Sequence, residues 1–303
     1  MNDIKIFVSC HRPSGVPKHS LLNPIQVGSA LAEEHFRGYL HDDDGENISG
    51  KNRSYCELTA QYWAWKNTEA DYYGFFHYRR YLYPNEAARF PYCIEAEPIP
   101  ETLKRLGYDG FETLIRRYDL LLPKKENMHI SVRKHYADAP FHHEKDLNLV
   151  VQILLEQHPE YEKAAELYLS GTQCYFGNIF IMCQKVFFDY CDWLFPILDE
   201  FDQRADLTGY NAQELRVNGY LAERLFGIWV CYHSEINTAE LPRVYFVPNR
   251  KERRKKQIIN FFLPPGSMRR ALVKRRLKHG DWFQIADAAI DGIGDTDGIR
   301  TYL

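Results

Sequence analysis

The chain has 303 residues, of which 45% are hydrophobic and 26% are charged, with 38 Lys and Arg against 41 Asp and Glu. This composition is typical of a globular protein, and the length suits one large domain or two small ones. No apolar run approaches the ~18 residues of a membrane-spanning helix and no signal-peptide pattern opens the chain, so neither an integral membrane protein nor a secreted one is expected.

The first predicted element is a strand over residues 4–10, IKIFVSC, which ends in His11-Arg12-Pro13. Residues 13–40 contain three Pro and several Gly residues, and we expect loop with only short regular pieces there. The acidic run that follows holds Asp42 and Asp44, whose spacing lets two carboxylates share one hard cation. Acidic residues before a Gly are also typical of a solvated turn, so both interpretations stay open.

A helix is predicted to begin at Ser54 and to end at Asn67, because Ser54 and Glu57 have the spacing of a capping box. Four apolar residues then share one helical face: Tyr55, Leu58, Tyr62 and Trp65. Such a face is more typical of core packing than of a cofactor site.

The apolar run at 72–76, YYGFF, predicts a strand that is buried on both faces of a sheet. His77 ends the run, and Arg79 and Arg80 follow. Open α/β sheets bind ligands at the carboxyl ends of such strands, and guanidinium groups match phosphate oxygens. Adjacent residues point to opposite sides, so one of the two Arg is expected to face a pocket; an ordinary solvated pair is the alternative.

Residues 44–83 contain DGENIS-x-KN-x-x-YCELTAQYWAWKN followed by YYGFFHYRRYL. This stretch closely resembles a family from bacterial capsular and exopolysaccharide gene clusters, long described as a domain of unknown function, in which some members are galactofuranosyltransferases. The resemblance continues more thinly through residues 4–10, 174–182 and 218–229. It implies an α/β nucleotide-sugar transferase of the GT-A kind, with a Rossmann-like nucleotide-binding half.

The resemblance also implies roles for particular side chains. Candidate donor-binding residues follow the first strand or lie in the motif: Ser9, His11, Arg12, Asp42, Asp44, Asn47, Lys51 and Asn52. The metal-binding D-x-D of many such enzymes follows a later strand, the place taken here by residues 77–80. We therefore expect Arg79 or Arg80, helped by His77, to neutralise the diphosphate. A divalent metal, held by Asp42 and Asp44 if by any residues, is not expected to be obligatory.

After residue 83 we expect a Pro-containing surface segment and then a short apolar strand at 118–123. Four His residues follow, at positions 129, 135, 142 and 143, beside Glu144 and Asp146. They lack the i, i+4 spacing of a metal pair, which favours a mobile, polar loop on the acceptor side. A phosphate-ester hydrolase that uses these His residues is kept as a rival. Helices are predicted over 146–157 and from Pro159 to Ser170.

Residues 174–182, CYFGNIFIM, predict an apolar strand interrupted by Gly177 and Asn178, which the resemblance places on the acceptor side. Helices are expected over 185–201 and 211–229. Within the second, Glu223 lies where enzymes of this kind supply a carboxylate base, and we assign it that role. An ordinary helical ion pair between Glu223 and Arg224 is the alternative.

Residues 251–280 contain eleven Lys and Arg against one acid, Glu252. Taking these from the whole-chain totals leaves 27 basic and 40 acidic residues elsewhere. Apolar residues are interleaved with the basic ones, and Pro264-Pro265-Gly266 splits the segment into two amphipathic pieces. We expect a catalytic domain at 1–249 and a segment at 250–303 that contacts an anionic membrane surface. Nucleic-acid binding and a solvated tail are the alternatives.

The sequence thus predicts an inverting hexosyltransferase, with UDP-galactofuranose the best single donor and a lipid-linked bacterial surface polysaccharide the acceptor. It is expected to be cytoplasmic, because its seven Cys residues form no CxxC pair, and peripheral on the inner face of the plasma membrane. No cofactor beyond the donor and no nucleic-acid partner are expected. The rival from another class is a non-catalytic nucleotide-sugar or glycan-binding protein.

Overall fold

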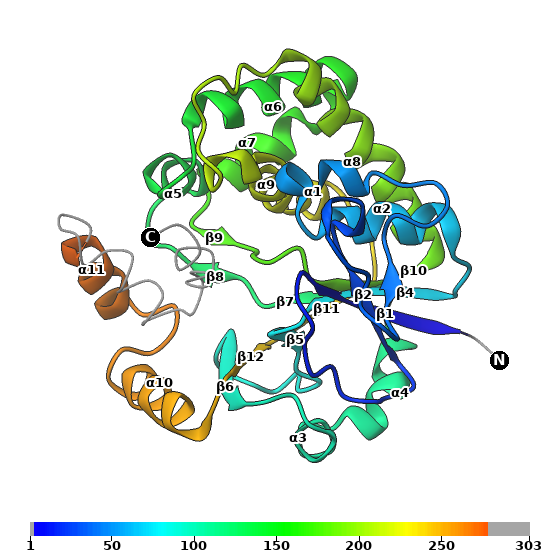
Figure 1. Cartoon of the computed structure of the whole chain (residues 1–303). Helices are drawn as coiled ribbons and strands as arrows, with labels where there is room; N and C mark the ends of the chain where they lie inside the picture. The colour runs from blue at the N-terminus through cyan, green and yellow to red at the C-terminus, as the bar shows by residue number, and fades with distance from the viewer. Residues whose placement is uncertain (1–2, 278–303) are drawn as a thin grey trace.

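Within residues 3–277, which the computed structural model describes, ten strands form one mixed sheet (Figure 1). They are Ile4–Cys10 (β1), Leu22–Gln26 (β2), Leu40–His41 (β3), Tyr72–His77 (β4), Arg80–Leu82 (β5), Tyr92–Ala96 (β6), Leu120–Pro123 (β7), Phe180–Cys183 (β10), Thr238–Leu241 (β11) and Arg243–Val247 (β12). The main order is β11-β7-β10-β4-β1-β2-β3, and β5 joins β4 to β12, which also pairs with β6. The predicted α/β class is confirmed.

The strands β3, β2, β1 and β4 are all parallel, which is the arrangement of one half of a doubly wound sheet. The predicted strand at 4–10 is β1, and the YYGFF run lies in β4 with both faces covered. Gly74 is required there, because a Cβ would lie 2.9 Å from the side chain of Ile6 and 3.0 Å from that of Ile181. The register places Ser9 beside His77, so the polar ends of β1 and β4 coincide.

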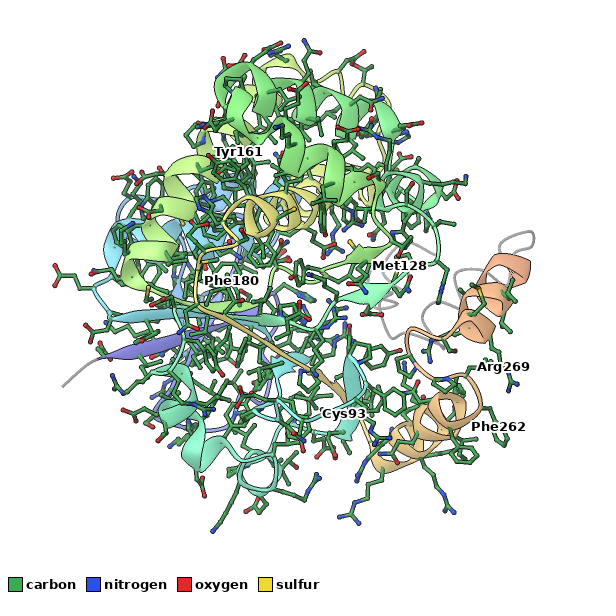
Figure 2. The ribbon with its side chains drawn as sticks, turned by 180° about the vertical axis from the view of Figure 1, so that it is seen from behind. Cys93, Met128, Tyr161, Phe180, Phe262 and Arg269 are labelled. Carbon is green, nitrogen blue, oxygen red and sulfur yellow. The ribbon has the colours of Figure 1, made fainter. Side chains whose placement is uncertain are left out.

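Most helices cover one face of this sheet (Figure 1). They are Asn52–Tyr55 (α1), Leu58–Asn67 (α2), Val132–Asp138 (α5), Glu144–Gln157 (α6), Glu162–Ser170 (α7), Gln184–Arg204 (α8) and Val217–Tyr232 (α9). Phe180, labelled in Figure 2, fills the space between sheet and helices, with its ring 5.4 Å from Phe75 and 5.5 Å from Phe226. Two short helices, Pro100–Arg105 (α3) and Phe111–Ile115 (α4), pack on the other face.

The prediction of one unbroken helix that begins with a cap at Ser54 is wrong. Cys56 has φ 51° and separates α1 from α2, and no side chain caps α2. The Ser54 hydroxyl is buried without a hydrogen-bond partner among the described residues, while the Glu57 carboxylate accepts from Asn178. At this break Cys56 packs closely on α9, since a Cβ on Gly219 would lie 3.2 Å from the Cys56 sulfur.

Two other expectations need correction. The His-rich segment is not a plain loop: it contains α5, whose first turn is capped by the Ser131 hydroxyl, which accepts from the Lys134 N–H. The Pro-containing surface segment contains β6, which is paired with β12. The segment at 174–182 is interrupted around Gly177 and Asn178 as predicted, but it is not one strand: Gln173–Cys174 (β9) pairs with Glu126–Asn127 (β8) in a separate two-stranded sheet, and β10 joins the main one.

The basic segment forms two helices, Arg250–Phe262 (α10) and Met268–Leu277 (α11), separated at Pro264–Gly266 as predicted. No helix of the described part of the chain is long and apolar enough to cross a membrane. Residues 278–303 of the predicted C-terminal segment lie outside the described residues, and the division at residue 249 stays a prediction.

Candidate functional site

The carboxyl ends of β1 and β4 bring several predicted site residues together. The His11 ring lies 6.2 Å from the His77 ring and 5.2 Å from the Tyr78 ring. The guanidinium groups of Arg12 and Arg79 lie 5.3 and 4.9 Å from the centre of the same Tyr78 ring. This end of the sheet is therefore lined by cations and rings that favour an anion.

Arg79 and Arg80 have different surroundings, as expected for adjacent residues. The Arg80 guanidinium lies 5.7 Å from the centre of the Tyr245 ring. Its positive charge acts to lower the pKa values of Glu223 and Arg243. The charge of Arg79 lowers the pKa of Lys256 in α10. The charge of Arg80 therefore reaches Glu223, and the charges of both Arg residues reach His77.

His77 is a neutral imidazole at neutral pH. Burial lowers its pKa well below the ordinary value, and the charges of Arg80, Arg79, His11 and Arg216 lower it further. Its Nδ1 accepts from the Arg79 backbone N–H at 3.4 Å, so the ring proton resides on Nε2. His77 can therefore donate a hydrogen bond to an anionic ligand.

A left-handed turn at Gly177 and Asn178, with φ values of 96° and 48°, positions two carboxylates. The Gly177 N–H donates to Glu223 Oε1 at 2.6 Å. Asn178 Nδ2 donates to Glu57 Oε1 at 2.9 Å and to the Gly219 carbonyl at 3.1 Å. Successive residues of one turn therefore hold both acids in place.

Buried Arg243 fixes the strand that leads into this turn. It donates to the Phe176 carbonyl at 3.1 Å and pairs with Glu126, which is itself nearly buried. A buried ion pair with these partners resists displacement, because separating it would leave a charge without a partner. The turn is thus pre-organised before any ligand binds.

Glu223 projects from α9 with its side chain 17% exposed, and Arg224 lies 3.2 Å from its Oε2. Burial raises the pKa of the Glu223 carboxyl above its ordinary value, Arg224 and the Gly177 N–H oppose that rise, and Glu57 adds to it. The predicted ion pair with Arg224 is present, but the net effect is a carboxylate that is readier to accept a proton.

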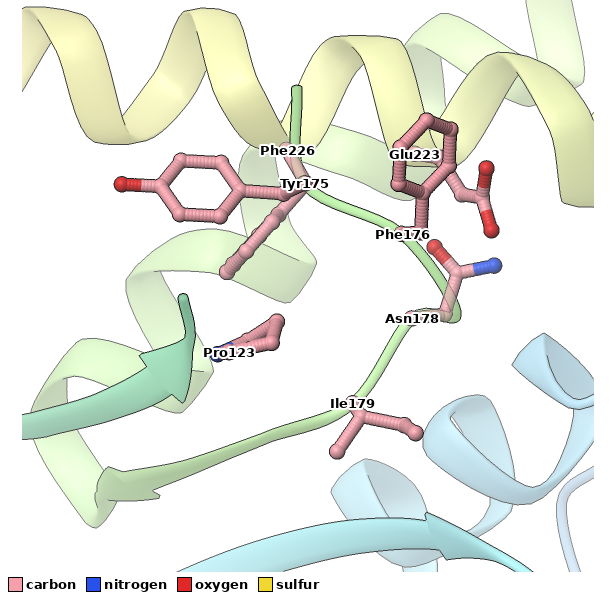
Figure 3. Close-up of a pocket in the computed structure, with 7 residues that line it drawn as sticks. All are labelled: Pro123, Tyr175, Phe176, Asn178, Ile179, Glu223 and Phe226. Carbon is pink, nitrogen blue, oxygen red and sulfur yellow. The ribbon is translucent and has the colours of Figure 1, made fainter. Parts of the chain in front are cut away.

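Glu223 also lines a small pocket (Figure 3). The lining residues are Pro123, Tyr175, Phe176, Asn178, Ile179, Glu223 and Phe226. Figure 3 shows the Glu223 carboxylate and the Asn178 amide on the same side of the loop, with aromatic rings beside them. It is a small hollow at the Gly177–Asn178 turn, lined by one carboxylate, one amide and several apolar side chains.

Sequence reasoning missed Glu57 and Arg216 as site residues. Arg216 lies in the short helix Glu214–Arg216 (η5), and its positive charge acts to lower the pKa values of Cys56 and His77. No local pattern identifies either residue, because their neighbours in the site come from distant parts of the chain. The only signal was the position of Glu57 inside the recognisable motif.

Asp42 belongs to the scaffold and not to a metal or donor site, which corrects both roles considered for it. It is 0% exposed, and its oxygens accept from the Gly28 and Ser29 N–H groups and from the Ser49 and Thr59 hydroxyls. The Asp44 side chain, in contrast, is 70% exposed. The residues present therefore do not fit the D-x-D metal pair, and no group of three metal ligands occurs among residues 3–277.

Replacing Asp42 with Ala should lower the free energy of unfolding by about 3 kcal/mol or more, because four buried donors would lose their acceptor. The matched change Asp44→Ala should stay within about 0.5 kcal/mol, since that side chain faces solvent. Urea unfolding of both variants measures the difference. Equal midpoints would contradict the scaffold role.

The other donor-binding candidates of the motif bind other protein groups. The Asn47 amide donates to the Asp43 and Gly45 carbonyls. The Lys51 ammonium lies 2.7 Å from Asp199 and 3.2 Å from Asp202. Asn52 donates to the Cys56 carbonyl and the Thr59 hydroxyl. These bonds connect the motif to itself and to α8, and donor contacts by these residues stay predictions.

The four His residues do not gather into one cluster. His129 contacts the Gly266 carbonyl at 3.0 Å, whereas His143 lies 3.1 Å from Glu214. His142 stacks between Tyr136 and Tyr220, and burial lowers its pKa to about 3. The structure therefore offers no shared site for the rival hydrolase chemistry in this segment.

Comparisons with known proteins are consistent with this architecture. Residues 5–234 match the family described as "Domain of unknown function (DUF4422)". A comparison with curated proteins gave no match. Among solved structures, the apo structure of WbbM, a bifunctional glycosyltransferase, is similar with 34% identity and a TM-score of 0.77. The alignment covers 81% of this chain and 45% of WbbM, so the chain spans less than half the length of that protein.

Proposed function

The chain belongs to the DUF4422 family, and from this premise we propose that it is a glycosyltransferase that uses a UDP-sugar donor. One observation carries the proposal: a carboxylate with a raised pKa, Glu223, lines a small pocket, and the charge of Arg80, which begins β5 just after β4, reaches that carboxylate. The similarity to a chain that includes a glycosyltransferase supports it.

In the proposed reaction an acceptor hydroxyl attacks the anomeric carbon of the donor sugar. Glu223 takes the hydroxyl proton as the new carbon–oxygen bond forms. The bond from the anomeric carbon to the diphosphate breaks, and the electron pair leaves with UDP. Arg80, Arg216 and the His77 Nε2–H stabilise the charge that develops on the diphosphate. A single displacement of this kind inverts the anomeric configuration.

Glu57 is the second carboxylate of the proposed site. Asn178 occupies one of its oxygens at 2.9 Å, which leaves the second oxygen to accept from a sugar hydroxyl. Because the preceding turn residue, Gly177, bonds to Glu223, the same turn fixes the positions of both acids. We assign Glu57 to orienting the sugar ring and Glu223 to proton transfer.

The finer parts of the proposal rest on the resemblance of residues 44–83 and on the arrangement of the sheet. The parallel order β3-β2-β1-β4 supports a GT-A-like enzyme with a Rossmann-like donor half. UDP-galactofuranose is the proposed donor, and a lipid-linked bacterial surface polysaccharide in the cytoplasm is the proposed acceptor. Neutralisation of the diphosphate by Arg and His means that no metal is required.

A non-catalytic nucleotide-sugar or glycan-binding protein is the competing function. Such a protein needs rings and hydrogen bonds but no proton acceptor. Glu223 is such a proton acceptor: its pKa is raised, and the Gly177 N–H holds its carboxylate in place. This favours the enzyme over the binding protein.

Purified full-length protein should release UDP slowly from its cognate UDP-sugar and faster when a glycan acceptor is added. A screen of UDP-sugars that measures free UDP identifies the donor. Activity should persist in excess EDTA, because no metal carries the leaving group. Donor binding without any UDP release would favour the binding protein, and complete EDTA inhibition reversed by manganese would show that a metal is needed.

A further inference from the structure

One face of α10 is attached to the body of the protein. Arg253 lies 3.3 Å from Glu95, and the Gln257 amide donates to the Ile94 carbonyl at 3.2 Å, both in β6. Asn260 accepts from Arg270 of α11 at 2.8 Å. These contacts define the inner face of the helix and hold the two helices together.

The opposite face carries cations and large apolar side chains. Its exposed residues on α10 are Lys251, Arg254, Lys255, Ile258, Phe261 and Phe262. Phe261 is 79% exposed and Phe262 67%, and Figure 2 shows Phe262 and Arg269 at the outer edge of the molecule. Met268 and Leu272 continue the apolar surface onto α11. Together these residues form what we call the outer face.

The charge of this region is opposite to that of the rest of the chain. Residues 250–277 contain eleven Lys and Arg against Glu252, while the other residues contain 27 basic and 40 acidic side chains. Local cations beside exposed Phe and Ile side chains match a surface that is anionic outside and apolar beneath. That combination describes the headgroup layer of an anionic bilayer.

Nucleic acid fits the outer face less well. The amides of Gln257 and Asn260, which could read base edges, are bonded to protein groups. The aliphatic side chains of Ile258, Met268 and Leu272 offer no ring for stacking on bases, yet they are about half exposed. Burial in lipid accounts for these side chains, whereas a phosphate backbone does not.

We propose that the outer face of α10 and α11 binds the surface of an anionic lipid bilayer. Two contacts connect these helices to the segments near the site: His129, shortly after β7, bonds to the Gly266 carbonyl, and Lys256 lies within the electrostatic reach of Arg79. Membrane binding through the outer face would therefore hold this side of the protein near the bilayer. The proposal does not depend on sugar transfer, because it rests on the surface alone.

The test uses full-length protein and sedimentation with vesicles of phosphatidylglycerol and phosphatidylcholine, compared with pure phosphatidylcholine vesicles. Binding should require the anionic lipid and fall with rising salt. The double change Phe261→Ser with Phe262→Ser should weaken binding about 10-fold or more. The triple change of Lys251, Arg254 and Lys255 to Gln should weaken it about 100-fold.

Matched controls separate this surface from general hydrophobicity and charge. Leu167→Ser on α7 removes a side chain that is 67% exposed, as Phe262 is, and Lys185→Gln on α8 removes an exposed cation. Both should bind like the unaltered protein, and urea midpoints confirm that every variant is folded. Equal binding of the outer-face variants and the controls, or binding to DNA with none to vesicles, would overturn the proposal.

An acidic segment near the C-terminus of the chain is a competing occupant of the outer face. Residues 281–303 contain five Asp against Arg300, together with Trp282 and Phe283. A protein that ends at residue 280 should bind vesicles about as well as the full chain. Vesicle binding that appears only after this deletion would mean that the chain's own acidic segment occupies the outer face, and the proposal for the intact protein would fail.

Discussion

Replacing Glu223 with Gln should reduce turnover by about 10²–10⁴-fold and leave donor binding near normal. The amide has the same shape and can still accept from the Gly177 N–H, but it cannot take a proton from the acceptor hydroxyl. Because burial raises the pKa of Glu223, the base of the unaltered enzyme is protonated at a higher pH than an ordinary carboxylate. Turnover should therefore fall with decreasing pH through that raised pKa, and this limb should be missing in the variant.

The measurements are UDP release across a pH series and donor binding by calorimetry. Glu240→Gln is the matched control, because Glu240 bonds to the Tyr175 hydroxyl at 3.0 Å on the far side of the pocket wall. Its turnover should stay within a few-fold of the unaltered enzyme. An unchanged kcat in Glu223→Gln would remove Glu223 as the base and direct attention to Glu57.

Arg80→Ala should lower kcat/KM by roughly 10²-fold or more, because a cation beside the leaving diphosphate would be lost. Arg80→Lys should recover part of that loss, since it restores the charge without the planar fork. Arg79→Ala is the natural comparison: the Arg79 guanidinium lies over the Tyr78 ring, and its charge lowers the pKa of Lys256 in α10. The loss of kcat/KM in Arg79→Ala should be at least 10-fold smaller than the loss in Arg80→Ala.

These variants also test the assignment of the two Arg residues. A larger loss in Arg79→Ala than in Arg80→Ala would reverse the assignment. If Arg80→Ala stayed within a few-fold of the unaltered enzyme, the leaving group would have to be stabilised elsewhere, and Arg216 would be examined next. The urea midpoints of both variants should be measured as well, because Arg80 also packs over the Tyr245 ring at 5.7 Å and its replacement removes that contact.

Local sequence determined the elements whose side-chain pattern has a single structural solution. The unalternating apolar runs at 4–10 and 72–76 fit only strands covered on both faces, and they are β1 and β4. Pro264 and Pro265 cannot continue a helix, so the basic segment had to divide into α10 and α11. The Gly177-Asn178 pair could be recognised as an interruption because both residues tolerate positive φ.

Tertiary contacts decided how the polar residues are used. A capping box at Ser54 and Glu57 is locally favourable, yet Glu57 bonds instead to Asn178, 121 positions away, and the helix breaks at Cys56. Asp42 has the spacing of a metal ligand, but burial against four donors makes it part of the scaffold. Hydrogen bonds and charges act through space, whereas sequence patterns report only neighbours along the chain. Which acids share the Gly177–Asn178 turn therefore became clear only in the folded molecule.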